Sequence, residues 1–200
     1  MRRSLLLVAL IACAAALAAG AQSALADGDG CPSEQLSQPF VPWGDQDQYT
    51  LAPNGDFEAG LAGWSVSGNA GLVAGPEPWM VTDAAESESL DLPAGSSATT
   101  APICLDVDDP SLRFFAVNNG DPGSTLSVSV SFTALLGIQV SLPIGDISSS
   151  GAWEPTPTVM IWANLLAALD PGMPVQFSFT PTGSGDWEID DVYIDPWGRS

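Results

Sequence analysis

The segment at positions 124–137 reads STLSVSVSFTALLG, in which apolar residues alternate with serine and threonine. Successive side chains of a β-strand point to opposite faces, so a period of two gives a strand with one apolar and one polar face. The pattern predicts a strand that covers a core on one side only. Its hairpin partner would be IQVSLPIG (138–145), joined through Leu136-Gly137, and its apolar face would carry Leu126, Val128, Val130 and Phe132.

Other short apolar segments recur along the chain and end in clusters of glycine, proline, asparagine and aspartate, which are turn-forming residues. Examples are SESLDLPAG, LRFFAVNNGDPG and PVQFSFTPTG. Strands separated by such turns every ~8–12 residues are typical of an all-β sandwich. One stretch, VMIWANLLAAL (159–169), predicts a single short helix, because Asp170-Pro171-Gly172 follows it as a stop signal.

The first 26 residues have the pattern of a secretory signal peptide. Two arginines precede an apolar run at 5–19, and Ala24-Leu25-Ala26 matches a small-x-small cleavage site. Two alternatives remain open. One is a membrane anchor, which needs about 20 apolar residues, and the other is a lipoprotein processed at Cys13. We expect a secreted protein with a signal peptide at 1–26, an extended proline-containing leader at 27–53 and a sandwich domain at 54–200.

Two cysteines, Cys31 and Cys104, remain after cleavage of the signal peptide. Paired cysteines are the usual state in exported proteins, so we expect a disulfide that ties the leader to a strand in the middle of the chain. Two buried free thiols are the alternative.

The charge balance restricts the function. The chain has no lysine and no histidine, and residues 27–200 carry two arginines against 24 acidic residues, a net charge of −22. Such a surface repels nucleic acids and anionic membranes, so neutral ligands or cations are the expected partners, although acidic residues also serve solubility alone. Without histidine or lysine there is no Ser-His-Asp triad and no Schiff base. We therefore expect no enzyme. The one enzyme class left open is a glycosidase that uses two carboxylates, with pairs such as Glu86/Glu88 or Asp108/Asp109 as candidates, although solvated acids explain such pairs in an acidic protein.

The C-terminal segment WEIDDVYIDPW (187–197) mixes a strand pattern with four acids. Trp187 and Ile189 are expected in the core, and Glu188 and Asp195 on the surface. Carboxylates are costly to bury unless they are paired or bind a metal, so Asp190 and Asp191 need an explanation.

Two motifs at opposite ends of the domain carry a family resemblance. NGDFEAGLAGW (54–64) resembles the opening strand of galactose-binding-like jelly rolls, which include several carbohydrate-binding module families, and WEIDDVYID (187–195) is similar to their closing strand. The chain also resembles small exported proteins of unknown function from high-GC bacteria. The resemblance implies a β-sandwich jelly roll in which the first and last strands are neighbours.

The resemblance further implies a structural calcium held by the glutamate of the opening motif and an aspartate of the closing one. The matching residues are Glu58 and Asp191, with Asp190 as a further candidate. Calcium takes six to eight oxygen ligands, which carboxylates on adjacent strands and turn carbonyls can supply. The alternative is that the two aspartates face solvent or cap backbone donors.

Tryptophans in loops are the candidate ligand contacts. Trp79 lies in GPEPW and Trp153 in SGAWEP, beside Glu77 and Glu154. An indole can stack on a sugar ring while a nearby carboxylate accepts its hydroxyls, although each tryptophan could instead plug one end of the sandwich. The sequence thus predicts a non-catalytic module for neutral carbohydrate. A structural or interaction protein of the cell envelope or extracellular matrix is the alternative, and the ligand, oligomeric state and physiological role stay open.

Overall fold

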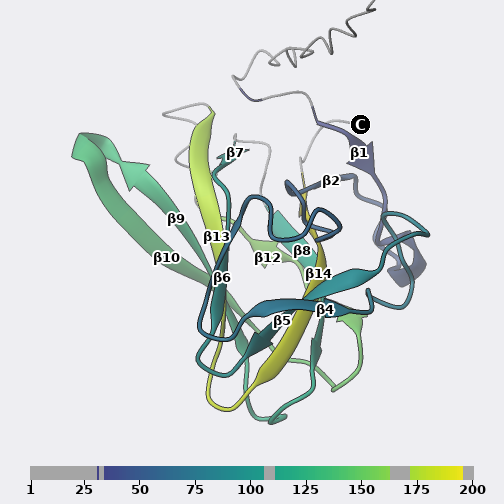
Figure 1. Ribbon diagram of the computed structural model, residues 1–200. Helices are drawn as coiled ribbons and strands as arrows, with labels where there is room; N and C mark the ends of the chain where they lie inside the picture. The colour runs from purple at the N-terminus through teal and green to yellow at the C-terminus, as the bar shows by residue number, and fades with distance from the viewer. Residues whose placement is uncertain (1–30, 32–33, 106–110, 163–171, 196–200) are drawn as a thin grey trace, which may run out of the picture.

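The structure is a computed structural model that describes residues 31, 34–105, 111–162 and 172–195 of the chain. Figure 1 shows two antiparallel sheets packed into a jelly-roll-like sandwich, which confirms the predicted all-β fold. Of the helix predicted at 159–169, Val159–Met160 is a short strand, and residues 163–169 lie outside the described part. No helix within that part is both long and apolar enough to cross a membrane.

The larger sheet is organised around its last strand, β14 (Asp186–Asp195). One edge of β14 pairs with β8 (Ser111–Asn118), which in turn pairs with two short strands, β11 (Glu154–Pro155) and β12 (Val159–Met160). Two strands share the other edge: β5 (Glu88–Pro93), which carries β4 (Gly71–Ala74), and β2 (Tyr49–Leu51), which carries β1 (Leu36–Ser37). Strand β2 precedes the opening motif, which forms turns over residues 54–63 rather than the entry strand that the resemblance implied. The motif still lies beside the closing strand, because Val192 N donates a hydrogen bond to Gly55 O.

The second sheet has the order β10-β9-β13-β6-β3, with β7 also paired to β13. Its strands are β3 (Trp64–Ser67), β6 (Ser97–Thr100), β7 (Ile103–Leu105), β9 (Leu126–Ala134), β10 (Ile138–Ile147) and β13 (Met173–Pro181). The alternation predicted for β9 is confirmed, because its apolar residues are buried and its hydroxyl residues lie on the outer face. The same holds for β13, so the core forms where the two apolar faces meet.

The N-terminal segment covers the outer face of the larger sheet. Phe40 and Tyr49 pack there against Phe115 of β8 and Tyr193 of β14, and together they form a second aromatic cluster away from the main core. Arg113 lies over the ring of Phe40 and forms an ion pair with Asp45. The segment expected as an extended leader thus contributes two strands and buried aromatic rings. It is tied to β7 by the predicted disulfide between Cys31 and Cys104.

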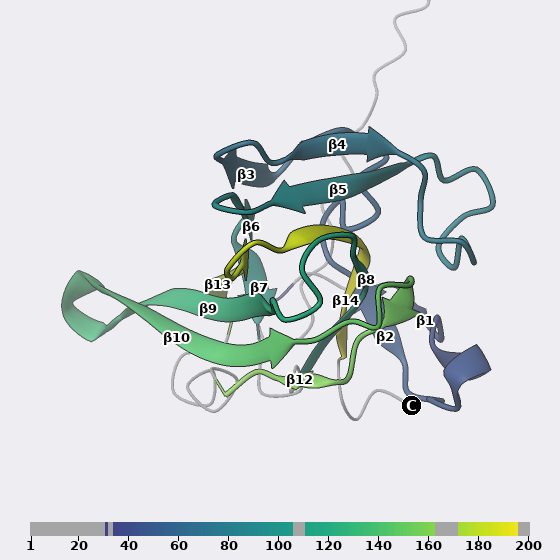
Figure 2. The same cartoon turned by 90° about the horizontal axis from the view of Figure 1, so that it is seen from below.

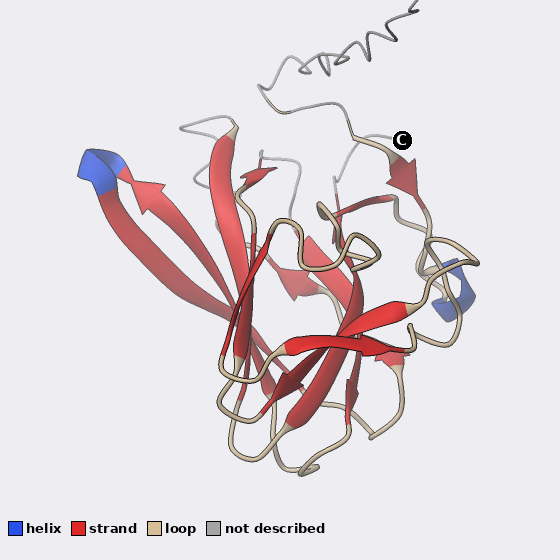
Figure 3. Ribbon diagram, viewed as in Figure 1, coloured by secondary structure: helices blue, strands red, loops and turns tan. Residues whose placement is uncertain are grey.

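The hairpin of β9 and β10 projects beyond the rest of the sandwich, as Figures 1 and 2 show from two directions. A single turn of 3-10 helix, η2 (Leu135–Gly137), forms its tip, and a second one, η1 (Val41–Trp43), lies in the N-terminal segment (Figure 3). Leu136 at the tip is 97% exposed, and Ile138 and Leu142 of β10 are also exposed. The outer part of the hairpin therefore presents apolar side chains to solvent.

Asp195 does not lie on the surface as predicted. It is buried at the end of β14, opposite Ser111, whose hydroxyl donates a hydrogen bond to its carboxylate. Glu188 is half-buried and accepts a hydrogen bond from the side chain of Asn119. Trp187, Ile189 and Trp64 are in the core, as expected.

Substitution of Ser124 by alanine is expected to lower the free energy of unfolding by about 1–3 kcal/mol, because two buried donors lose their acceptor. The Ser124 hydroxyl accepts from the Asn118 amide at 3.1 Å and from the Trp187 indole at 3.2 Å. Urea denaturation measures the change. Ser129→Ala, on the outer face of β9, is the control and should change stability by less than about 0.5 kcal/mol; equal effects of the two substitutions would contradict the prediction.

Candidate functional site

A β-bulge in the closing strand places two successive buried aspartates, Asp190 and Asp191, beside the same loop. Pairing between β14 and β8 shifts register between Asp190 and Tyr193, and Asp191 has a left-handed backbone with φ of 50°. Before the bulge, odd-numbered residues such as Ile189 face the core, whereas after it even-numbered ones such as Val192 do. An extra residue in a bulge reverses the facing of a strand in this way.

The bulge coincides with a change of partner along one edge of β14. Strand β5 pairs with residues 186–189 and β2 pairs with Tyr193 and Ile194, so neither strand covers the aspartates between them. Next to this gap, the opening motif and the residues just before it bond to the backbone of Val192: Ala52 N donates to Val192 O, and Val192 N donates to Gly55 O. The gap leaves room for the loop between β4 and β5, residues 75–87, to reach the aspartates.

Asp190 is fully buried and holds backbone groups. One of its oxygens accepts from the backbone N–H of Glu77 at 2.9 Å and the other from that of Asp191 at 2.9 Å. Burial and the neighbouring Asp191 raise its pKa. The side chain of Asp190 therefore links the backbone of the β4–β5 loop to that of β14.

Three carboxylates converge beside it: Glu77 and Glu86 from the β4–β5 loop, and Asp191 from β14. We call them the acid cluster. Each offers an oxygen that lies within 4.8 Å of the others, and all three residues are buried. Glu86 is 7% exposed and Asp191 0%. One buried oxygen of each of these two, Glu86 Oε2 and Asp191 Oδ2, has no hydrogen-bond partner among the described residues.

Three negative charges in the acid cluster are unfavourable unless a cation is bound among them. Burial raises the pKa of Glu86 to about 6, and the carboxylates of Glu77 and Asp56 act in the same direction. Burial, together with Glu86 and Glu77, also raises the pKa of Asp191. Buried like charges with unpartnered oxygens need protons or a cation.

The cluster fits a divalent cation. Oxygens bound to one calcium at about 2.3–2.6 Å can be at most about 5 Å apart, and the three cluster oxygens meet this limit. The donors are all oxygen, a set that suits calcium better than zinc or copper. The acid cluster could therefore hold a metal, with the two unpartnered oxygens as available ligand atoms.

Glu58, the other metal ligand implied by the resemblance, points elsewhere. Its carboxylate accepts from Ser87 N at 2.6 Å, Ser87 Oγ at 2.8 Å and Glu88 N at 2.9 Å. Burial opposes ionisation of Glu58, but these hydrogen bonds outweigh it and lower its pKa. The structure thus brings Asp191 together with Glu77 and Glu86, while Glu58 anchors the end of the same loop.

Trp79 lies on the outer side of the β4–β5 loop and is 45% exposed. Its ring meets that of Trp43 edge to face, with centroids 4.8 Å apart, and both rings contact Phe115. We call Trp43 and Trp79 the tryptophan pair. An exposed indole held by other rings is a preformed apolar surface of the size of one sugar ring.

The remaining sequence candidates are distributed differently. Trp153 is half-buried and packs against the second aromatic cluster, and Glu154 accepts a hydrogen bond from Ser150 N at 3.1 Å. Glu77 is fully buried, and its two oxygens accept from Trp79 N and Val81 N. Glu77 is therefore part of the acid cluster, and its carboxylate is hydrogen-bonded to the backbone of Trp79.

The sequence identified neither Glu77 nor Glu86 as a metal candidate, since Glu77 was expected as a sugar contact, and it did not identify Trp43 as a partner of Trp79. The segment between Glu77 and Glu86, PWMVTDAA, is mostly apolar, so no local pattern marks these two acids as a cation site. No local pattern links Trp43 to Trp79, because they meet only when the N-terminal segment folds over β8.

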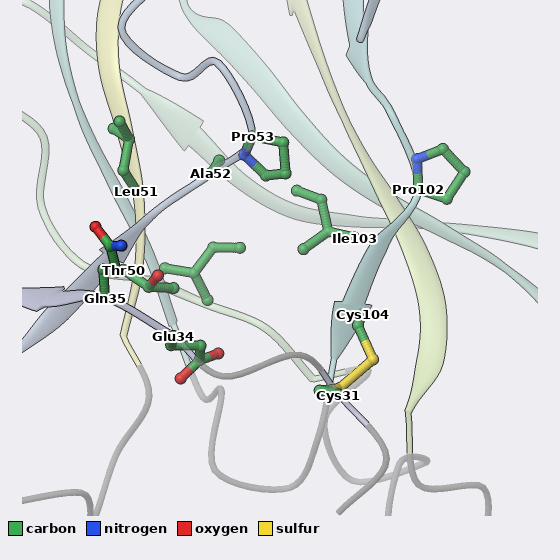
Figure 4. A pocket seen from close by; sticks show the side chains of 11 residues that line it. Cys31, Glu34, Gln35, Thr50, Leu51, Ala52, Pro53, Pro102, Ile103 and Cys104 are labelled. Atoms are coloured by element: carbon green, nitrogen blue, oxygen red, sulfur yellow. A yellow bond between two sulfur atoms is a disulfide. The ribbon is translucent and has the colours of Figure 1, made fainter. Parts of the chain in front are cut away.

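A cavity of about 490 Å³ lies beside the disulfide, between the N-terminal segment and β7 (Figure 4). Its lining is largely apolar, with Leu51, Ile103 and Ile194, and the carboxylate of Glu34 lies among them. No aromatic ring lines it among the described residues, so the cavity offers no stacking surface.

In the presence of a chelator, stability is expected to fall as pH rises from about 5 to about 8. Asp190, Asp191 and Glu86 have raised pKa values in the folded protein. The folded state therefore keeps protons that the unfolded chain has released, and the stability that these protons provide is lost as pH rises through the folded pKa values. Thermal denaturation in chelator at several pH values measures this dependence, and stability that rises over the range would contradict it.

The comparisons with known proteins support the fold. No family model matches the sequence, and no curated protein matches it. Among solved structures, the chain is similar to the CBM22-1–GH10 modules of Clostridium thermocellum endo-1,4-β-D-xylanase 10B, complexed with xylohexaose, at 20% identity and a TM-score of 0.52, covering 72% of this chain and 28% of that one.

A second similar structure is the CBM22-1–CBM22-2 tandem domain of Paenibacillus barcinonensis Xyn10C. It shows 12% identity and a TM-score of 0.52, over 76% of this chain and 45% of that one. The chain thus spans less than half the length of either structure. At these identities the likeness concerns the fold, and the chain has the jelly-roll-like β-sandwich fold found in carbohydrate-binding modules.

Proposed function

We propose that this chain is an exported, non-catalytic module that binds neutral carbohydrate and contains a structural calcium site. The observation that carries the proposal is the exposed Trp79, held against Trp43 on the surface of a sandwich with the fold of carbohydrate-binding modules. Stacking of an indole on the apolar face of a sugar ring needs no charge on the ligand, which suits a chain with a net charge of −20.

Export and the lack of catalysis rest on separate observations. The disulfide between Cys31 and Cys104 suits an oxidising compartment, in agreement with the signal-peptide pattern of residues 1–26. The absence of histidine and lysine removes the common nucleophile-activating groups, and the buried Glu86 would serve the cation rather than act on a substrate.

The calcium site is assigned to the acid cluster, in place of the pair Glu58 and Asp191 implied by the resemblance. One oxygen of each cluster carboxylate lies close enough to the others for one ion, and Glu86 and Asp191 each retain an oxygen with no hydrogen-bond partner within the described part of the chain. A bound cation would offset the repulsion among the three carboxylates and hold the β4–β5 loop against β14.

Retention on neutral polysaccharides tests the carbohydrate proposal. The protein is expected to bind at least one insoluble or arrayed neutral glycan, and Trp79→Ala is expected to lose this binding because the stacking surface disappears. Trp162→Ala is the matched control, since Trp162 is 62% exposed but lies beyond β12, outside the tryptophan pair. Retention that survives Trp79→Ala, or none on a broad panel, would contradict the proposal.

The projecting hairpin favours a second candidate, an interaction protein of the cell envelope or extracellular matrix. Leu136, Ile138 and Leu142 are exposed apolar side chains on an element without charged residues between positions 124 and 145, and such patches often mark protein interfaces. Cross-linking through the hairpin to a protein partner, without retention on any glycan, would favour this alternative.

A further inference from the structure

We propose that a divalent cation in the acid cluster sets the position of Trp79, so that the tryptophan pair forms a sugar-stacking surface only in the cation-bound protein. This inference rests on the proposed function and adds to it a dependence of glycan binding on the cation. It requires a direct connection between the cluster and Trp79, a reason for the loop to have two states, and a fixed partner ring.

The connection runs through Glu77. Its carboxylate belongs to the acid cluster, and the same two oxygens accept from the backbone N–H of Trp79 at 2.6 Å and of Val81 at 2.8 Å. A displacement of this carboxylate therefore moves the backbone that carries the Trp79 ring. The link is only two residues long, too short for the chain between them to absorb the displacement.

The far side of the loop is attached to the same cluster. Glu86 Oε1 accepts from the backbone N–H of Thr82 at 3.2 Å and of Asp83 at 2.9 Å, and the Thr82 hydroxyl donates to Asp191. Both flanks of the segment 79–81 are thus held by cluster carboxylates. Met80, at the centre of this segment, has a left-handed backbone with φ of 49°, a conformation that a non-glycine residue keeps only when its surroundings impose it.

The two states follow from charge. With a cation, three carboxylates are drawn to one point and the β4–β5 loop is held against β14. Without one, each cluster carboxylate that ionises is repelled by its neighbours across a buried site, and two of the carboxylates retain oxygens with no partner in the described structure. Opening of the loop toward water relieves both penalties. A ligand that interacts differently with two states shifts their populations.

Trp43 is the fixed partner. It lies in η1, followed by Gly44 with φ of 85°, and its ring packs on Phe115, which is fully buried. None of these contacts involves the acid cluster. Loss of the cation would therefore move Trp79 away from Trp43 rather than move both rings together, and the right-angled surface formed by the tryptophan pair would be lost.

Fluorine NMR of protein labelled with fluorotryptophan tests the coupling without altering the fold. The Trp79 signal, assigned by its absence in Trp79→Phe, is expected to shift when calcium is added to chelator-treated protein. The signal of Trp162, assigned in the same way with Trp162→Phe, is expected to stay in place. In Glu86→Gln, which leaves the hydrogen bonds of Glu77 to the loop in place, the calcium response of Trp79 should disappear.

Retention on a neutral polysaccharide, measured with calcium and with chelator, completes the test. We expect retention to weaken by roughly 5- to 150-fold in chelator, the usual range for coupled sites. An unchanged Trp79 signal in protein whose melting temperature responds to calcium would overturn the coupling and leave the cation site standing. Equal retention in both conditions would overturn it as well. A Trp79 signal that responds to calcium, without retention on any glycan, would support the coupling and count against the carbohydrate function.

Discussion

Addition of calcium to chelator-treated protein is expected to raise the melting temperature by roughly 5–15 °C at a concentration 100 to 1,000 times the Kd. The physical reason is the acid cluster. The folded chain has gathered three buried carboxylates within 4.8 Å, whereas the unfolded chain has no such site. A ligand that binds only the folded state adds its binding free energy to stability. Differential scanning calorimetry with calcium, and with chelator, measures the shift.

Two variants locate the site. Asp191→Asn removes a cluster charge while its amide oxygen can still accept from Thr82, so we expect loss of the calcium shift together with higher stability than the unaltered protein in chelator at neutral pH. Glu58→Gln is the control, because Glu58 binds Ser87 and Glu88 outside the cluster. A calcium shift abolished by Glu58→Gln and kept by Asp191→Asn would contradict the assignment to the acid cluster.

Replacement of Cys31 and Cys104 by serine is expected to lower the free energy of unfolding by about 4 kcal/mol. The disulfide joins residues 73 positions apart, and its loss frees a long loop in the unfolded chain. It also releases the start of the N-terminal segment, which contributes Phe40 and Tyr49 to the second aromatic cluster.

Urea denaturation of the double variant, compared with each single variant, measures this loss. Equal losses in all three proteins are expected, because either substitution removes the same bond. A double variant as stable as the unaltered protein would show that packing of β1, β2 and the aromatic cluster holds the segment without the disulfide.

Most of the fold follows from short-range patterns. The alternation in β9 and β13 places apolar side chains on one face whatever the rest of the chain does, because successive residues of a strand face opposite sides. The disulfide was predicted for a similar reason: an exported chain with two remaining cysteines has one possible pairing. The buried positions of Trp187 and Ile189 also follow from the alternation at the start of β14.

The prediction from alternation failed in β14, at the point where this strand is irregular. The bulge at Asp190 and Asp191 inserts one residue and reverses the facing of the residues beyond it. No residue in WEIDDVYID is a glycine or another bulge signal, so a regular strand was the natural reading. Burial of Asp195 next to Ser111 was missed for the related reason that cross-strand partners are not encoded locally.

The candidate site depended on tertiary structure more than the assignment of the strands did. Carboxylates on the last strand were recognised from the sequence as needing a partner, because burial of an isolated charge is costly. Which carboxylates join Asp191 was decided by the gap that β5 and β2 leave along one edge of β14, since that gap admits the β4–β5 loop with Glu77 and Glu86. Trp43 likewise meets Trp79 only because the N-terminal segment crosses β8. Patterns along the chain determine which faces of the strands are apolar, whereas contacts between residues more than 30 positions apart arise from strand order and loop paths, which no local pattern specifies.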